Sequence, residues 1–238
     1  MKMTETHIEQ KKGISLTPRL MKAAEYARCG RKIADIGTDH AYLPIYLVSN
    51  GISSSAVACD VKIGPLSRAS DNISEYRLES KIQTLLTDGL HGVDNFAPDD
   101  IFICGMGGEL ISTIISECDY VRARNVRLIL QPMTHADLLR AFLSDNGFRI
   151  VDEDIVSENN RKIYQIIVAE YSGEPYKLTE AEKLIGPINI KKKSVLLNGF
   201  VRMNIKTLKN KADGLKTAGQ NIDEISELIG SLDLICGE

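Results

Sequence analysis

The sequence lacks the patterns that would place it in several large classes of protein. No window of eighteen residues is apolar throughout, so we expect no membrane span. The opening segment, MKMTETHIEQKKG, has no apolar signal core, and we expect a cytoplasmic protein. The five cysteines include no CxxC pair, which argues against a disulfide framework and against a bound metal, and fits a reducing compartment.

Two phosphate-binding motifs are also missing. No GK[ST] sequence occurs, which excludes a P-loop. The turn after the first expected strand has one glycine, Gly37, followed by Thr38, Asp39 and His40. A dinucleotide-binding turn has G-x-G-x-x-G instead, so that a pyrophosphate can lie on a helix N-terminus. The bulky, acidic turn suits a cofactor without phosphates that carries a positive charge, such as S-adenosylmethionine (SAM).

The part of the chain up to residue 172 alternates between strand and helix patterns. The expected strands are 32–36, 55–60, 82–86, 100–104, 127–131, 148–153 and 163–170. The expected helices are 16–28, 41–50, 65–79, 107–118 and 135–146. Such alternation predicts a mostly parallel sheet covered on both faces, and the last two strands form an antiparallel hairpin because only a short polar turn joins them. We therefore predict an α/β fold with the Rossmann-like, seven-stranded sheet of class I SAM-dependent methyltransferases.

The remaining residues follow a different pattern. From Val201, apolar or small residues recur in alternating steps of four and three, with a break near 217–221. This predicts two antiparallel helices that form a coiled-coil-like appendage. We expect a SAM-binding domain at 1–172 and a helical domain at 173–238. The spacing is compatible with a hairpin within one chain and with a dimer.

Charge is unevenly distributed between these parts. The chain has a net charge of −3, but residues 183–216 hold nine Lys or Arg and one acid, Asp213. A basic helical strip on an acidic body is typical of a protein that binds a polyanion, although a solvated helix face is the alternative. The residues expected to contact the polyanion are Lys191, Lys192, Lys193, Arg202, Lys206, Lys209 and Lys211.

Acidic residues stand at the carboxyl ends of three neighbouring strands. These are Asp35, Asp60 and Asp88, and in a parallel sheet such ends face one crevice. An acid after the second strand typically binds the ribose hydroxyls of a nucleoside cofactor. For each residue alone, a helix cap or an Asp-Gly turn is the alternative. Together they predict a cofactor site that includes Asp35, Gly37, Thr38, Asp39, His40, Asp60, Val61, Asp88 and Gly89.

The ends of the fourth and fifth strands complete the crevice. The glycines of Cys104–Gly108 indicate either close approach of the backbone to a ligand or a tight turn, and the first explanation adds Gly105, Met106 and Gly107 to the cofactor site. Enzymes that methylate exocyclic amines usually have an Asp/Asn-Pro-Pro-aromatic motif here, and its absence argues against that reaction. On the fifth strand, Gln131 offers a donor and an acceptor and Met133 a polarisable surface for a base.

These motifs resemble those of a known family. ADIGTDHAYLPIYL, ICGMGGELI, LILQPMTHADLLRAFL and IGP at 185–187 are similar to signatures of bacterial tRNA (adenine-22-N1)-methyltransferases of the TrmK type. The resemblance runs from about Leu16 to the end of the chain. It implies SAM-dependent methylation of N1 of adenine 22 in tRNA, with the C-terminal helices helping to hold the RNA.

The chemistry implied by this resemblance needs no base, because N1 of adenine has a free lone pair. The methylated product is cationic, so nearby acids and carbonyl groups would stabilise the developing charge. Asp39 and Gln131 are the candidates for this catalytic role, while the roles of Arg19 and Tyr42 stay open, with a surface position the preferred interpretation of Arg19. The alternatives are a methyltransferase for a protein or small molecule, whose helical tail serves dimerisation, and a non-catalytic SAM- or RNA-binding module.

Overall fold

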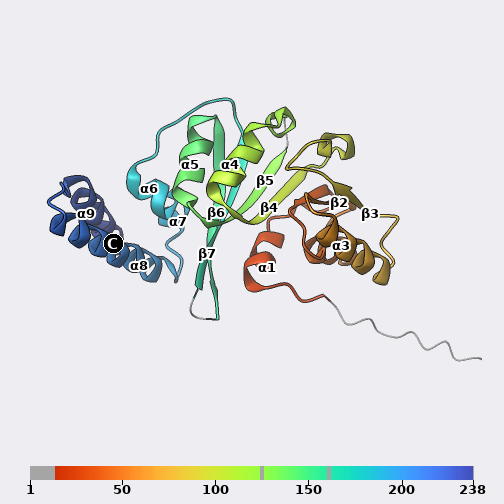
Figure 1. The fold of residues 1–238 in the computed structure, drawn as a ribbon, viewed down its shortest axis with the longest axis horizontal. Coiled ribbons are helices and arrows are strands. Elements are labelled where there is room, and N and C mark those ends of the chain that lie inside the picture. Colours follow the sequence, from red (N-terminus) through yellow and green to blue (C-terminus); the bar gives the residue numbers. More distant parts are fainter. Residues whose placement is uncertain (1–13, 124–125, 160–161, 238) are drawn as a thin grey trace, which may run out of the picture.

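A single mixed sheet forms the centre of the molecule in the computed structural model, which describes residues 14–123, 126–159 and 162–237. Its seven strands lie in the order β3-β2-β1-β4-β5-β7-β6 (Figure 1). They are β1 (Lys32–Ile36), β2 (Ser55–Asp60), β3 (Ile82–Leu86), β4 (Asp100–Gly107), β5 (Arg127–Thr134), β6 (Phe148–Glu158) and β7 (Lys162–Tyr171). β7 runs antiparallel to both of its neighbours, and the other pairs are parallel. The predicted Rossmann-like sheet with a terminal antiparallel hairpin is confirmed.

Helices cover both faces of this sheet, as the alternating pattern predicts. They are α1 (Pro18–Ala24), α2 (Tyr42–Ser49), α3 (Ile63–Glu75), α4 (Gly108–Ser116) and α5 (Ala136–Asp145), with the short 3-10 helices η1 (Val93–Phe96) and η2 (Asp119–Arg122). Successive residues of a strand point to opposite faces, so Ile101 and Ile103 of β4 pack in the core beneath α4 and α5. Phe102, between them, packs in the second core with α1, α2 and α3.

The structure differs from the expected elements in several places, and β6 also runs on to Glu158, beyond the expected end at 153. α1 ends at Ala24 instead of Arg28, and Tyr26 beyond it donates a hydrogen bond of 2.7 Å to Asp154 of β6, so the chain leaves the helix to reach the sheet. β4 continues to Gly107 and β5 to Thr134, and the register of this pair shifts around Met106. Two helices, α6 (Glu180–Ile185) and α7 (Pro187–Lys192), stand where none was expected.

A buried ion pair connects these two helices to the sheet. The Arg140 Nε of α5 lies 2.6 Å from Glu153 Oε1 of β6, and neither side chain is exposed. Arg140 also donates to the Lys183 carbonyl at the end of α6, and Glu153 Oε2 accepts the Ile188 N–H in the first turn of α7. A side chain at Gly186 would overlap the Glu153 carboxylate, which explains a glycine in the IGP segment.

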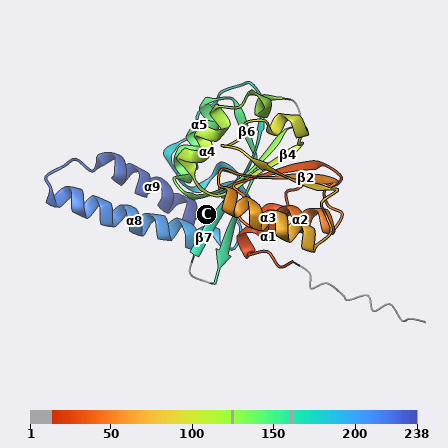
Figure 2. The same ribbon diagram turned by 45° about the vertical axis from the view of Figure 1, so that its right-hand side comes forward.

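The chain ends in a helical hairpin. α8 (Leu197–Thr217) and α9 (Asp223–Gly237) pack against each other and extend away from the sheet (Figure 2). Phe200, Val201 and Leu232 bury a small core together with Ile155 of β6 and Ile185 of α6. The two helices and their break stand where the sequence predicts them. Within the described residues, no helix is both long and apolar enough to cross a membrane.

Candidate functional site

The crevice expected from the sequence belongs where the strand order reverses, at β1. β1 has β2 on one side and β4 on the other, and the carboxyl ends of these parallel strands lie at the same edge of the sheet. In open α/β sheets, ligands bind outside this edge at the reversal point. The predicted site residues of the first, second, third and fourth strands all lie at the ends of those strands or in the turns that follow.

The turn after β1 is held close to β2 by its backbone. The N–H groups of Gly37 and Thr38 both donate to the Cys59 carbonyl, at 2.9 and 2.8 Å. Gly37 has φ +78°, a left-handed conformation that glycine adopts without strain, and a Cβ there would overlap the Met106 side chain from β4. The two sides of the reversal point therefore meet at Gly37 and Met106.

Asp35 is the buried acid of this crevice. Its exposed fraction is 7%, and burial raises the pKa of its carboxyl to about 6. A hydrogen bond with the Thr38 side chain lowers that pKa, and the negative charge of Asp60 raises it. A carboxylate that has lost its water without gaining a cationic partner favours a positively charged ligand.

Asp60, Val61, Asp88 and Gly89 form the rim at the ends of β2 and β3. The Asp60 Oδ1 accepts the Lys62 N–H at 2.7 Å. The Val61 side chain is largely exposed and offers an apolar surface next to it. Asp88 is exposed, and Gly89 has φ +58° and packs against Ile114 of α4. Asp60 and Asp88 thus stand at the same carboxyl edge of the sheet, and the exposed Val61 directly follows Asp60.

Asp39 lies on the outer side of the crevice, paired with an arginine that the sequence did not indicate. Its Oδ1 is 2.9 Å from an Arg68 nitrogen on α3, and its Oδ2 is 3.2 Å from His40 Nε2. Asp39 and Arg68 are both more than half exposed, so this is a surface ion pair. The His40 ring stacks on Tyr42 with 5.1 Å between ring centroids. Tyr42 therefore packs against the turn.

The glycines at the end of β4 and at the start of α4 serve two different purposes. Gly105 has φ +84° and lies close to the Arg19 side chain, so it is on the crevice side. Gly108, at the start of α4, has no room for a Cβ because the His135 carbonyl lies against it. For Gly108 the structure therefore supports the tight-turn explanation, because two backbone segments pack together there.

Gln131 is fully buried within β5, three residues before the strand ends at Thr134. Its Oε1 accepts a hydrogen bond of 2.6 Å from the Arg19 guanidinium, and its Nε2 donates to the Pro132 carbonyl at 3.0 Å. Met133, two residues further on, is 45% exposed. Arg19 also lies over the Tyr164 ring, 5.9 Å from its centroid. The surface position preferred for Arg19 was therefore wrong, because α1 directs this side chain inward.

The basic residues of the C-terminal part divide into separate groups. Arg202, Lys206 and Lys209 are exposed and share one face of α8, since each lies three or four residues from the next. Lys211 is exposed on the opposite side, where it lines a groove between α8, α9, α5 and α6. Lys192 is a correction to the expected RNA contacts, because Asp152, Asp154 and the Glu153 carbonyl hold its ammonium group against the sheet.

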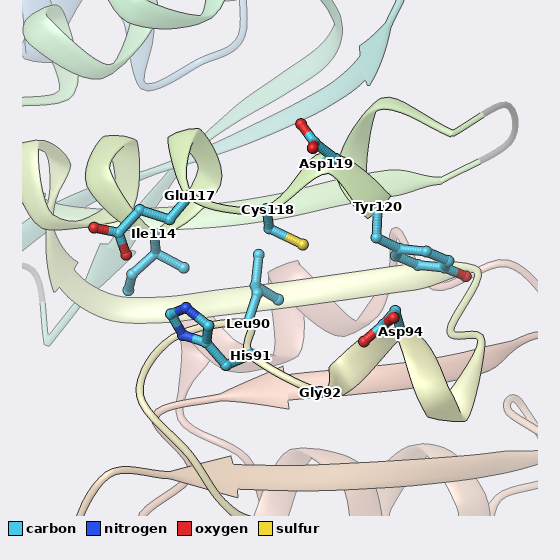
Figure 3. Close-up of a pocket in the computed structure, with 9 residues that line it drawn as sticks. All are labelled: Leu90, His91, Gly92, Asp94, Ile114, Glu117, Cys118, Asp119 and Tyr120. Carbon is cyan, nitrogen blue, oxygen red and sulfur yellow. The ribbon is translucent and has the colours of Figure 1, made fainter.

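A separate pocket of about 240 Å³ lies between η1, α4 and η2 (Figure 3). The residues that line it are Leu90, His91, Gly92, Asp94, Ile114, Glu117, Cys118, Asp119 and Tyr120. None of the predicted site residues is among them. Among the described residues, no group of three or more His, Cys, Asp or Glu side chains could hold a metal ion.

The sheet order, the reversed β7 and the acids at the carboxyl ends of β1, β2 and β3 define a class I SAM-dependent methyltransferase. A family model described as TrmK, tRNA (adenine(22)-N(1))-methyltransferase, matches residues 33–233, and the chain belongs to this family.

A relative and several solved structures are similar over nearly the whole chain. The tRNA (adenine(22)-N(1))-methyltransferase of Bacillus subtilis (strain 168) is 33% identical over 232 residues, which are 93% of this chain and 96% of the relative. A Streptococcus pneumoniae structure in complex with S-adenosyl-L-methionine is 33% identical, with a TM-score of 0.81, over 93% of this chain and 100% of that chain. The structure of M. capricolum TrmK in complex with S-adenosyl-homocysteine is 28% identical, with a TM-score of 0.74, over 92% of this chain and 96% of that chain.

Proposed function

We propose that the protein transfers the methyl group of SAM to N1 of adenine 22 of tRNA. The observation that carries this proposal is the buried Asp35 carboxyl beside the Gly37 turn, at the strand reversal of a chain of this family. The Bacillus subtilis relative is named for the same reaction.

The residues of the crevice fit SAM. Among the residues that the structure describes, none places a cationic group on the buried Asp35 carboxyl, which suits the positive end of the cofactor. Asp60 keeps a carboxylate oxygen for the ribose hydroxyls, since Oδ1 is the atom that accepts the Lys62 N–H. The exposed Val61 offers an apolar surface for the adenine ring. We assign the remaining contacts to Thr38, Asp39, His40, Asp88, Gly89, Gly105, Met106 and Gly107.

The chemistry of N1 of adenine determines which steps of the methyl transfer the protein must assist. SAM supplies an activated methyl group, and N1 of adenine supplies its own lone pair, so alignment is the main requirement. N1 lies on the Watson–Crick edge, so the nucleotide must be unpaired or flipped out before it reaches the crevice. The exposed Met133 at the end of β5 provides a surface on which the base can stack.

Asp39 and Gln131 are the residues that we propose for stabilising the cationic product. Negative charge and carbonyl oxygens near the ring favour that product electrostatically. The Asp39 carboxylate is partly neutralised by Arg68 in the present arrangement, so this role requires that the exposed ion pair opens. The Gln131 Oε1 has a second lone pair in addition to the one that Arg19 occupies.

The hairpin is the part that we propose to hold the tRNA. Arg202, Lys206 and Lys209 form one exposed basic face on α8, and recognition through phosphates needs such a face. We retain Lys191 and Lys193 as further contacts, assign Lys211 only a minor one because it points away from this face, and leave out Lys192. In this proposal residues 1–172 form the catalytic domain and 173–238 the RNA-binding domain, in the cytoplasm.

Methyl transfer to tRNA transcripts tests the proposal. Purified protein with tritiated SAM is given in vitro transcribed tRNA with adenine at position 22 and the same tRNA with another base there. We expect transfer to the first and none to the second. Transfer to both would contradict the position, and no transfer to any tRNA, with SAM binding intact by calorimetry, would favour a protein or small molecule as acceptor.

A further inference from the structure

Arg19 and Gln131 connect the first helix to the end of the fifth strand. Arg19 begins α1 beside Pro18, and Gln131 lies 112 positions further along the chain. Their side chains meet at 2.6 Å, although Arg19 is only partly buried and Gln131 is not exposed at all. The Tyr164 ring from β7 supports the guanidinium from beneath.

The contacts of Gln131 settle which way its amide points. Arginine only donates hydrogen bonds, so the atom facing Arg19 must be the carbonyl oxygen Oε1. The Nε2 group then faces the Pro132 carbonyl at 3.0 Å and the Met133 sulfur at 3.5 Å. If the amide were rotated by 180°, its Oε1 would face the Pro132 carbonyl oxygen, and two acceptors would repel each other. All three contacts therefore agree on one orientation.

These contacts form a chain that ends at an exposed side chain. Arg19 fixes Gln131, and the Gln131 amide fixes Pro132 and Met133, where the protein surface begins. Met133 is 45% exposed next to the carboxyl edge of the sheet. An unbranched thioether is flexible by itself, so a fixed position must come from its neighbours.

We propose that Arg19 is a positioning residue that acts through Gln131 to hold Met133 where the target base stacks. This inference rests on the proposed methyl transfer to a base, and it adds a residue that makes no contact with the base itself. A direct contact of Arg19 with an RNA phosphate is the competing explanation. The two differ in what they do to kcat, to the KM for tRNA and to its salt dependence.

A double-mutant cycle separates the two explanations. Arg19→Leu and Gln131→Leu should each lower kcat by roughly 10- to 100-fold, the cost of a hydrogen bond to a charged group. The kcat of the double variant should be no lower than that of Gln131→Leu alone, because both changes break the same series of contacts. The KM for tRNA and its salt dependence should stay unchanged. Arg19→Lys should recover part of kcat, since its ammonium group still donates to Oε1.

A second measurement does not depend on activity. With methyl-labelled methionine, the Met133 resonance, assigned from its loss in Met133→Leu, should shift in Arg19→Leu and in Gln131→Leu. The control is Lys22→Leu on the same helix, whose side chain pairs with Glu25, and it should leave both kcat and the resonance unchanged. Three outcomes would each overturn the inference. They are a kcat loss in the double variant equal to the product of the two single losses, a raised KM for tRNA with weaker salt dependence, and a Met133 resonance that does not shift. Failure of the wild type to methylate tRNA would instead contradict the proposed function.

Discussion

Arg140 and Glu153 form an ion pair in which neither side chain has any exposed area, with 2.6 Å between Nε and Oε1. Their remaining polar atoms are used as well, since Arg140 donates to Gln165 and to the Lys183 carbonyl and Glu153 accepts the Ile188 N–H. Residues of α5, β6 and β7 thereby fix the start of the C-terminal part. The pair stabilises the joint between the sheet and the helices that follow it.

Removing one partner of this pair should be costly. Glu153→Gln leaves the Arg140 charge buried without its counter-charge, and we expect the free energy of unfolding to fall by about 3–5 kcal/mol. Urea unfolding at pH 7 measures it. Glu180→Gln is the control, because Glu180 pairs with Lys183 at the surface and should change stability by about 1 kcal/mol or less. Equal effects of the two variants would show that the buried pair has no special role.

Asp35→Asn should change how stability depends on pH. The pKa of this carboxyl is about 6 in the folded protein and 3.8 in the reference state, so the folded state holds the proton more tightly. Its contribution to stability is therefore present at low pH and is lost as the pH rises through 6. The variant should gain on the wild type by about 2 kcal/mol between pH 4 and pH 7.

The measurement for Asp35 is urea unfolding of both proteins without SAM across this pH range. A difference between wild type and variant that does not vary with pH would disprove the prediction. Asp71→Asn at an exposed position of α3 provides the control for the Asp→Asn change itself. The same Asp35→Asn change should weaken SAM binding, because the acid that faces the positive end of the cofactor is gone.

Asp60→Asn should affect the cofactor and leave the fold intact. The amide oxygen can still accept the Lys62 N–H, but the charge and one strong acceptor for the ribose hydroxyls are lost. We expect the Kd for SAM to rise about 10- to 100-fold, with kcat largely kept once SAM is saturating. Calorimetric titration measures the affinity, and Asp71→Asn serves again as the control. An unchanged Kd would remove Asp60 from the proposed site.

Lys209 and Lys211 offer a matched test of the basic face of α8. They are two residues apart, which is about 200° around a helix, so they point to opposite sides. Lys209→Gln, together with Arg202→Gln and Lys206→Gln, should raise the KM for tRNA and leave the Kd for SAM unchanged. Each lost phosphate contact should also reduce the salt slope by about 0.7–0.9. Lys211→Gln should have a much smaller effect, and equal effects of Lys209→Gln and Lys211→Gln would refute a one-sided RNA surface.

The sheet and the rim of acids could be predicted because both follow from local patterns. Apolar runs that alternate with helical spacing predict a parallel sheet, and the parallel sheet alone places Asp35, Asp60 and Asp88 at one edge. The hairpin strands β6 and β7 were also predicted, since only a short polar turn separates them. α6 was missed although a signal was present, because Thr179 and Glu182 form a capping box.

The contacts of individual charged residues could not be predicted in this way. Arg19 and Gln131 are far apart in sequence, and no periodicity says that α1 directs one side chain inward. Lys192 belongs to a run of three lysines, but only the folded chain brings it to Asp152 and Asp154 of β6. Asp39 meets Arg68 for the same reason. Such pairings depend on how elements pack against one another.

The anchored hairpin has a consequence for how the enzyme selects one nucleotide. α8 has 21 residues and is therefore about 30 Å long, and its first turn packs in one apolar cluster with Ile155 of the sheet through Phe200 and Val201. If its basic face binds the tRNA as proposed, the length of the hairpin sets the distance between the bound phosphates and the crevice. The nucleotide that reaches the crevice is then selected by that distance and not by the sequence around it. Moving the basic residues of this face by one helical turn, about 5.4 Å, would bring a different nucleotide of the same tRNA to the crevice.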